Sequence, residues 1–488
     1  MPDGRPPARA ITGWGRTAPS VATVVPVADD RGVDVALGGH SARVAPAGGV
    51  IARGLGRSYG DAAQCAGGTV IDAVTGGAGF RVDAALGTVI AMGGASFDDI
   101  LRAIVPAGWF VPVTPGTRYV TVAGALACDI HGKNHHADGS FARHVTEVVL
   151  RLPGGERRVV GPDADPDAFW ATTGGMGLTG LVESVTFRLV PISSSRLLVD
   201  TRRTADLEGT MLALAESDGD HRYSVAFVDL LAKGGALGRG VLTAGDFAPL
   251  DALSPGERRD RYAYRAGQPL AAPPWAPSGL LNRRTIGAFN ALWYRKAPAH
   301  RDGELQSIPA FFHPLDAVRG WNRLYGRRGF VQHQSVVPFG QEAALRSMVE
   351  LLAAAGAASF LAVLKRFGAA APGPLSFPMP GWTLALDLPA GQGALGPLLD
   401  RLDRLVVDAG GRVYLAKDAR LDPALLPVMY PRLAEWQAVQ RRLDPGAVMR
   451  SDLSRRLGLC GPTSSATGAH SATDAVADGR ATVDQEPS

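Results

Sequence analysis

The chain has 488 residues, of which 46% are hydrophobic and 20% charged, and its formal net charge is +4. This length and apolar content allow two or three domains with full hydrophobic cores. The lysines and arginines are dispersed, so no basic stripe indicates nucleic-acid binding. We see no long apolar run and no signal-peptide pattern. We therefore expect a protein without a membrane span, cytoplasmic or peripheral at the cell envelope, with membrane contact at most peripheral.

The three cysteines, Cys65, Cys128 and Cys460, are too few and too scattered for a disulfide framework or a CxxC metal site. We therefore expect a reducing compartment. Residues 1 to about 12 and the polar, low-complexity tail 460–488 are predicted to be disordered.

Between these ends, short runs rich in Val and Ile alternate with Gly-rich turns, which predicts a sheet-rich α+β fold with interleaved helices. The first strands are expected at Val21–Val27, Gly49–Arg53, Thr69–Ala73 and Thr88–Met92.

Helix signals are clear at three places. Ser96 and Asp99 form a capping-box pair before an apolar face that Pro106 ends. A second helix is predicted over Glu342–Ala355, and a third from Pro397 to Gly410. The last two alternate with strands, which indicates a second domain built as an antiparallel sheet backed by helices. These strands are expected at Gln332–Val337, Ser359–Lys365, Thr383–Leu388 and Arg412–Leu415.

The segment from Gln268 to Ala299 holds four prolines between Pro269 and Pro277 and shows no clear period. We interpret it as a long mobile loop or lid.

The stretch ARGLGRSYGD, Ala52–Asp61, follows a predicted strand at Val50–Ile51. Glycines spaced in this way leave backbone N–H groups free to face phosphate oxygens, and Arg53 or Arg57 could balance the charge. The stretch also matches the G-x-S-x-G elbow of hydrolases, but no helix follows it, which argues against that interpretation. A plain Gly-rich turn remains the alternative.

The stretch Thr114–Ser140 combines glycines, small residues, histidines and Lys133, a mixture that suits backbone pressed against a large ligand. Cys128, His131 and the pair His135/His136 could suggest a zinc site, but Lys133 inside the cluster would repel a cation. We predict no metal. His131 is better suited to donate or shuttle a proton beside a cofactor or a substrate hydroxyl, whereas the other histidines could be structural.

A glycine-rich turn into an apolar strand, Gly174–Phe187, could let a flat ligand approach the backbone. In the second domain Gln332 and Gln334 share one face of their strand, which suits a ligand-facing wall; a solvent-facing strand is the alternative.

Several motifs occur in a fixed order: RGLGRSYGDAAQ, PGTRYVTVAGALACDIHGKNHH, GGMGLTG, LKRFG, LSFPMPGW, YLAKDAR and MYPRL. Together they make the chain resemble the decaprenylphosphoryl-ribose oxidase family, within the vanillyl-alcohol oxidase type of FAD proteins. The resemblance implies a two-domain fold in which 13–194 and 412–459 bind FAD and 195–411 form the substrate domain. It also implies a non-covalent flavin, because the first Gly-rich loop lacks an attachment histidine.

The resemblance also implies site residues. Those carried over to FAD are Arg53, Gly54, Leu55, Gly56, Arg57, Ser58, Tyr59, Gly60, Pro115, Gly116, Thr117, Thr121, Gly124, Cys128, Ile130, Gly132, His136, Gly177, Val182 and Tyr414. Those expected at the substrate are Lys133, Phe227, Gln332, Gln334, Lys365, Ala385, Asp387 and Lys417.

In this family the hydrogen on C2′ of a polyprenylphosphoryl ribose leaves as hydride, and a separate NADH-dependent keto-reductase completes the epimerisation. The residues expected to be catalytic are Lys417, His131 and Tyr59. A related oxidase of free sugars or alditols is the alternative. The chain departs from mycobacterial members at Ala385, where they carry a cysteine, and at Phe227 and Phe312, where Trp and Tyr are expected.

Overall fold

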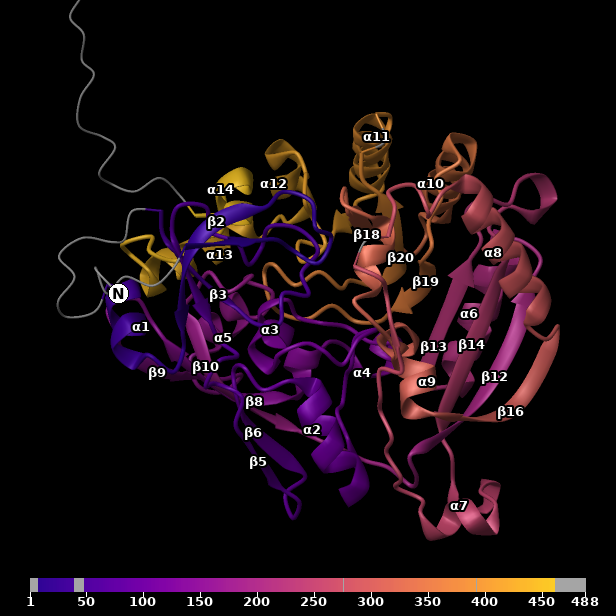
Figure 1. Cartoon of the computed structure of the whole chain (residues 1–488), viewed down its shortest axis with the longest axis horizontal. Coiled ribbons are helices and arrows are strands. Elements are labelled where there is room, and N and C mark those ends of the chain that lie inside the picture. Colours follow the sequence, from indigo (N-terminus) through magenta and orange to yellow (C-terminus); the bar gives the residue numbers. More distant parts are fainter. Residues whose placement is uncertain (1–7, 39–47, 275, 392, 461–488) are drawn as a thin grey trace, which may run out of the picture.

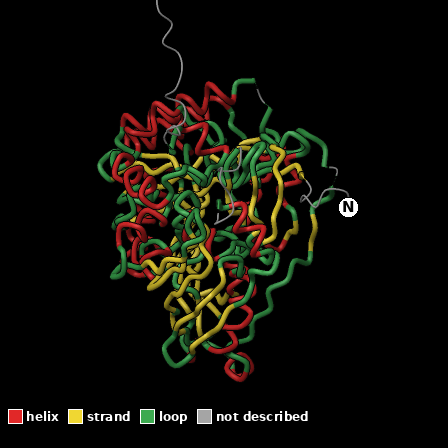
Figure 2. Tube along the Cα trace, turned by 90° about the vertical axis from the view of Figure 1, so that its left-hand side faces the viewer, coloured by secondary structure: helices red, strands yellow, loops and turns green. Residues whose placement is uncertain are grey.

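The computed structural model describes residues 8–38, 48–274, 276–391 and 393–460. Figure 1 shows two sheet-containing bodies side by side. The N-terminal part, in indigo and purple, shares one body with the yellow C-terminal helices, and the magenta and orange segments form the other. Figure 2, turned by 90°, shows strands running through the middle and lower part of the molecule. The predicted α+β fold with an antiparallel-sheet second domain is confirmed.

The first domain contains a four-stranded sheet in the order β1-β2-β4-β3 and a five-stranded antiparallel sheet in the order β5-β6-β10-β8-β9. The strands are β1 (Ala8–Ile11), β2 (Ser20–Pro26), β3 (Val50–Arg53), β4 (Thr69–Asp72), β5 (Phe80–Asp83), β6 (Thr88–Met92), β7 (Trp109–Phe110), β8 (Val145–Arg151), β9 (Arg157–Val160), β10 (Leu181–Arg188) and β11 (Val190–Pro191). The helices are α1 (Asp30–Ala36), α2 (Phe97–Ile104), α3 (Val122–Ala127), α4 (His135–Asp138) and α5 (Pro166–Thr172).

Strand β1 corrects the prediction that residues up to about 12 are disordered. It pairs antiparallel with β2 from Ala8 to Ile11 although its side chains are largely exposed. The strand is therefore held by its backbone ladder, which leaves no apolar signal in the sequence. Of the predicted tail 460–488, Cys460 is described and residues 461–488 lie outside the described part of the chain.

The C-terminal segment returns to the first domain, where Met449 bridges to Val50 in parallel. This segment carries α12 (Leu426–Met429), α13 (Leu433–Leu443) and α14 (Asp452–Leu457).

The second domain is an eight-stranded antiparallel sheet in the order β16-β12-β14-β13-β19-β20-β18-β21. Its strands are β12 (Arg196–Thr204), β13 (Tyr223–Val228), β14 (Gly240–Phe247), β16 (His300–Ser307), β18 (Phe330–Pro338), β19 (Ala362–Phe367), β20 (Gly381–Pro389) and β21 (Arg412–Val413). Because β21 pairs with β18, the expected boundary after residue 411 falls inside this sheet. The helices are α6 (Leu207–Asp220), α7 (Pro255–Arg259), α8 (Arg283–Lys296), α9 (Ile308–Phe312), α10 (Glu342–Ala355) and α11 (Leu395–Asp408).

Helix α8 contradicts the expected loop over 268–299. Four of its prolines lie before residue 278, where β15 (Leu270–Ala271) pairs with β17 (Val318–Arg319), and Pro298 follows the helix. Asn282 then starts the helix through a capping box with Thr285, and Ile286 is buried. The capping pair of Asn282 and Thr285 was present in the sequence, but the proline-rich stretch before it led to the prediction of a loop. In the described part of the chain, no helix is long and apolar enough to cross a membrane.

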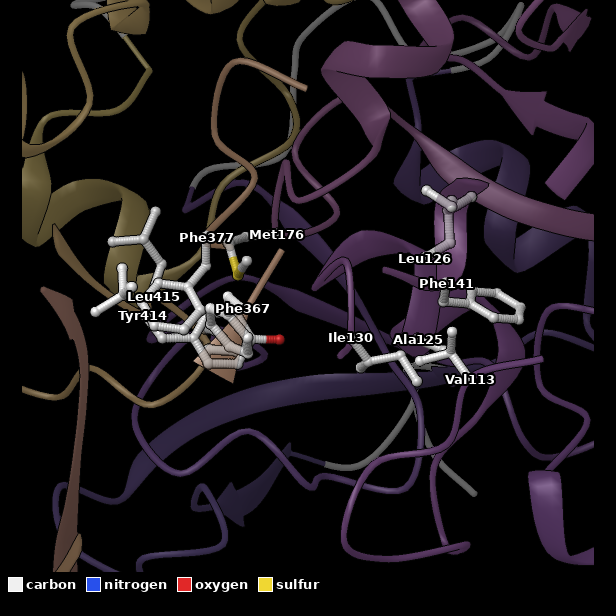
Figure 3. Packing of buried hydrophobic residues seen from close by; sticks show 14 of the residues in the cluster. Val113, Ala125, Leu126, Ile130, Phe141, Met176, Phe367, Phe377, Tyr414 and Leu415 are labelled. Carbon is white, nitrogen blue, oxygen red and sulfur yellow. The ribbon is translucent and has the colours of Figure 1, made fainter. Parts of the chain in front are cut away.

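Aromatic residues hold the two domains together. Figure 3 shows Phe367 and Phe377 gathered with Tyr414 and Met176. The ring centroid of Phe367, at the end of β19, lies 4.8 Å from that of His131 and 4.5 Å from that of His135, both in the first domain. The second sheet is thereby packed directly against the loops of the first domain.

Candidate active site

A cavity of about 370 Å³ lies between the first-domain loops and the second sheet. It brings together most of the predicted site residues from segments far apart in the sequence. The predicted residues that line it are Gly54, Leu55, Gly56, Arg57, Ser58, Tyr59, Pro115, Gly116, Thr117, Thr121, Gly124, Cys128, Ile130, His131, Gly132, Lys133, Gly177, Val182, Gln332, Gln334, Lys365, Ala385, Tyr414 and Lys417.

The first wall is the loop 54–58 that follows β3. None of its five backbone N–H groups donates to an acceptor among the described residues. Gly56 has φ +64°, a left-handed conformation that turns successive amides in one direction. A Cβ on Gly54 would lie 2.2 Å from Thr121 Oγ1. Free amides on a close-packed glycine turn suit the pyrophosphate of a dinucleotide.

The second wall is the loop before α3. Asp316 of the second domain accepts hydrogen bonds from Thr117 Oγ1 at 2.6 Å and from Arg118 N at 2.8 Å. The fully buried Arg118 also donates to Asp98, 2.5 Å away. These charge-assisted bonds fix the loop against the opposite domain.

His131 projects from this region into the aromatic packing of Phe367, Phe377 and Tyr414. Gln334 Nε2 lies 2.8 Å from His131 Nε2, and burial lowers the pKa of His131 well below its usual value. The ring is therefore neutral and accepts at Nε2, which leaves its proton on Nδ1. Among the described residues that buried Nδ1 has no partner, so it is free to donate to a bound ligand.

Three half-buried lysines surround the same space. Burial lowers the pKa of Lys133 and of Lys365 to about 7 and that of Lys417 to about 8. Lys133 Nζ donates to Phe311 O at 2.6 Å, and Lys417 Nζ lies 3.9 Å from the centroid of the Tyr59 ring. Cations desolvated in this way gain most from an anionic or electron-rich ligand.

The sheet places the two glutamines beside their partners. Across the β18–β20 pair, Gln332 faces Asp387 and Gln334 faces Ala385. Gln332 Nε2 donates to Asp387, whose pKa burial raises to about 7. Asp387 lies directly opposite Gln332 on the same face of the sheet, but it is not among the residues that line the cavity. Ala385 lies in the lining.

Four further predicted residues lie outside the lining. Arg53 donates to Thr12 O at 2.8 Å and Ala63 O at 3.1 Å, which is a structural role. His136 Nε2 lies 3.0 Å from the carbonyl oxygen of His221.

The other two are Gly60 and Phe227. A Cβ on Gly60 would lie 1.9 Å from Asp418 O, so the glycine permits a close approach of two backbones. Phe227 instead packs on Trp293 of α8, with ring centroids 6.4 Å apart.

Several lining residues escaped the sequence analysis, above all Trp14, Leu315 and Trp321. Trp14 lies in the segment after β1, and the other two lie in short 3₁₀ helices of the second domain, Pro314–Ala317 and Trp321–Tyr325. Apolar residues in such short segments show no period, so only the long-range packing of Trp14 on Trp321, with centroids 5.9 Å apart, reveals them.

Comparison with known proteins agrees with this geometry. Residues 40–161 match the model of a family described as FAD binding domain. The chain is 42% identical over 455 residues to decaprenylphosphoryl-β-D-ribose oxidase of Mycolicibacterium smegmatis, covering 92% of this chain and 98% of that protein. The chain belongs to the decaprenylphosphoryl-β-D-ribose oxidase family. Within this family it is a FAD-dependent oxidoreductase.

Two other relatives are similar to this chain over different extents. An uncharacterized protein of Streptomyces coelicolor is 44% identical over 369 residues, 74% of this chain and 99% of that protein. L-gulonolactone oxidase 2 of Arabidopsis thaliana is 25% identical over 135 residues, 26% of this chain and 23% of that protein. The wider similarity to sugar-lactone oxidases thus covers only a limited part of the chain.

The residues present fit FAD. The free amides of residues 54–58 suit its pyrophosphate, and the Nδ1–H of His131 together with Lys417 suits the polar edge of its ring system.

Proposed function

We propose that this protein oxidises the 2′-hydroxyl of a polyprenylphosphoryl-β-D-ribose to a 2′-keto sugar, the first half of an epimerisation to the arabinose form for cell-wall arabinan. The observation that carries the proposal is the similarity to the mycobacterial oxidase over 92% of this chain, because it includes both the cofactor loops and the substrate-domain sheet. The 2′-keto product would pass to a separate NADH-dependent reductase.

FAD supplies the acceptor for the hydride that leaves C2′. The protein contributes orientation and charge. Lys417, held over the ring of Tyr59, presents an ammonium at the cavity wall, where it stabilises negative charge that develops as the hydroxyl loses its proton. The His131 Nδ1–H group, oriented by Gln334, donates to an oxygen of the ligand.

The remaining polar wall holds the sugar. Lys133, Lys365 and Gln332 line the cavity and together offer donors to several ribose oxygens. The fixed positions of Gln332 and Gln334 on one strand face restrict the orientation of the sugar ring, which favours oxidation at a single carbon.

The test is direct oxidation by the purified, FAD-loaded protein. Farnesylphosphoryl-β-D-ribose should bleach the flavin without air and yield a keto sugar two mass units lighter, whereas free ribose and alditols should react far more slowly. Equal or faster bleaching by a free sugar or an alditol would favour the alternative of a free-sugar oxidase. Labelling at C2′ with deuterium should slow the bleaching, and labelling at C3′ should leave it unchanged.

A further inference from the structure

The side chain of Arg57 lies in the cavity wall without a polar partner among the described residues. It donates no hydrogen bond and forms no ion pair with any described residue, and its Nε is buried and unsatisfied. The two arginines with almost no exposed surface are paired: Arg118 with Asp98, and Arg151 with Asp30. A half-buried guanidinium without an ion pair, whose Nε is buried and unsatisfied, is costly, which indicates a site completed by a ligand.

The charges around Arg57 are already balanced without it. The carboxylate that raises its pKa, Asp316, accepts from Thr117 and from the backbone and side chain of Arg118. Arg118 shares Asp98 with Arg102. Two cations thus face two carboxylates, and Arg57 adds one more positive charge at the cavity wall. The ligand that would balance the charge of Arg57 is therefore an anion.

The contacts of Arg57 are aromatic. Its guanidinium carbon lies 3.8 Å from the centroid of the Trp14 ring and 5.5 Å from that of Tyr119. Trp14 packs edge-on against Trp321 of the second domain, and Leu315 belongs to the same apolar cluster. Trp14, Trp321 and Leu315 also line the cavity. A cation thus lies beside an apolar wall, which is the arrangement that an amphiphilic anion requires.

We propose that the side chain of Arg57 binds the phosphate of a lipid-linked sugar substrate and that Trp14, Leu315 and Trp321 pack on the first carbons of its chain. The proposal rests on the proposed function and names the part of the site that selects a lipid phosphate over a free sugar. The backbone of Arg57 remains part of the amide loop that faces the cofactor. The pyrophosphate of FAD is the other phosphate that could pair with this side chain, and the experiment separates the two.

The variants are Arg57→Gln, which removes the charge, and Arg57→Lys, which keeps the charge but loses the planar fork. Arg81→Gln, on exposed β5, is the matched control. The substrates are farnesylphosphoryl-β-D-ribose and farnesyl β-D-riboside, which lacks the phosphate. Bound flavin per protein and the melting temperature are measured for every variant.

We expect Arg57→Gln to raise KM for the phosphorylated substrate roughly 10- to 100-fold, as loss of a charge-assisted hydrogen bond predicts. KM for the uncharged riboside and the flavin content should not change, and Arg57→Lys should fall in between. Loss of flavin from Arg57→Gln would show that the side chain serves the cofactor, which overturns the proposal. An equal rise in KM for both substrates would also overturn it, because the substitution would then have altered the cavity rather than removed a contact to the phosphate.

A binding measurement keeps this proposal separate from the proposed function. Farnesyl phosphate, which has no sugar, should perturb the flavin absorbance of the wild-type protein and of Arg81→Gln, and much more weakly that of Arg57→Gln. If the wild-type protein fails to oxidise the ribose but shows this pattern, the proposed function fails and the phosphate site stands. If it oxidises the ribose and Arg57→Gln keeps the wild-type KM, the phosphate site fails and the function stands.

Discussion

The ammonium of Lys417 lies 3.9 Å from the centre of the Tyr59 ring, although 358 positions separate the two residues in the chain. The backbone fixes this pair, because Tyr59 N donates to Ala416 O at 3.1 Å. Arg456 of α14 adds a second link, since it donates to Asp61 at 2.9 Å and to Asp418 at 2.8 Å. The positions of the two side chains expected to be catalytic therefore depend on each other.

Replacement of Lys417 by Met should leave FAD bound but reduce kcat by roughly a hundredfold or more, because an oxyanion-type stabilisation is lost. Stopped-flow reduction of the flavin by substrate measures the effect on chemistry directly. The control is Lys233→Met at an exposed position, which should behave as the wild type. Near wild-type reduction in Lys417→Met would move the role elsewhere, first to His131.

The pH dependence follows from the same lysine. Burial lowers the pKa of Lys417 from 10.5 to about 8, so the ammonium is present below pH 8 and is lost above it. The rate of flavin reduction should therefore fall above pH 8, by about tenfold per pH unit for a single essential proton. In Lys417→Met the rate of flavin reduction should not show this fall above pH 8.

Loss of folded protein does not explain a fall in the rate of flavin reduction above pH 8. An unfolded lysine titrates near 10.5, so between pH 8 and 10.5 the unfolded chain binds more protons at this group than the folded protein. The contribution of Lys417 to stability consequently rises with pH in that window. A melting temperature that falls together with the activity above pH 8 would contradict the assignment.

Local signals in the sequence predicted the elements that carry their own caps. Helix α2 begins at Ser96, whose side chain accepts from Asp99 N, and α10 ends at Gly356 in the left-handed conformation, both as expected. The alternation of Gln332 and Gln334 likewise predicted their common face. Each of these features depends on residues within a few positions of one another.

The parts that the sequence did not predict depend on long-range contacts. Strand β1 exists through pairing with β2, and the place of Trp14 in the cavity depends on Trp321, far along the chain. The lack of an ion pair for Arg57 likewise depends on residues far apart in the chain, because Asp98 and Asp316 are engaged by Arg102, Arg118 and Thr117. Sequence analysis identified the cofactor loop but could not separate the role of its backbone from that of this side chain.

The turn at Gly56 should be sensitive to a single methyl group. Gly56 has φ +64°, and a Cβ there would lie 2.3 Å from Arg53 Nη2. Gly56→Ala should weaken FAD binding roughly 5- to 30-fold, in line with the cost of a left-handed residue. Titration of the apoprotein with FAD measures the change. Gly235→Ala, where nothing lies within 4 Å of the new methyl, should bind FAD as the wild type does.

The flavin should be released by acid. The loop 54–58 contains no histidine, and His131 is already hydrogen-bonded to Gln334. The cavity thiol, Cys128, has its pKa raised by burial to about 11 and remains a protonated, weak nucleophile. Precipitation with trichloroacetic acid should therefore leave the yellow colour in the supernatant, and colour retained in the pellet would contradict this.

Ala385 offers a way to test how the second sheet faces the cavity. It lies opposite Gln334 in the β18–β20 pair and is 8% exposed in the cavity lining. A thiol at this position would share the cavity with the cations Lys365 and Lys417, which favour the reactive thiolate. Ala385→Cys should therefore react with iodoacetamide at neutral pH and gain one adduct in the intact mass.

The native cysteines should not interfere with that measurement. Burial raises the pKa of Cys65, and it raises those of Cys128 and Cys460 to about 11 and about 12. Wild-type protein and Ala385→Ser should thus stay unmodified under the same conditions, and farnesyl phosphate should slow the reaction of Ala385→Cys by filling the cavity. An adduct on the wild-type protein would show that one of its own thiols is accessible. An unreactive Ala385→Cys would mean that this strand turns its side chain at residue 385 away from the cavity.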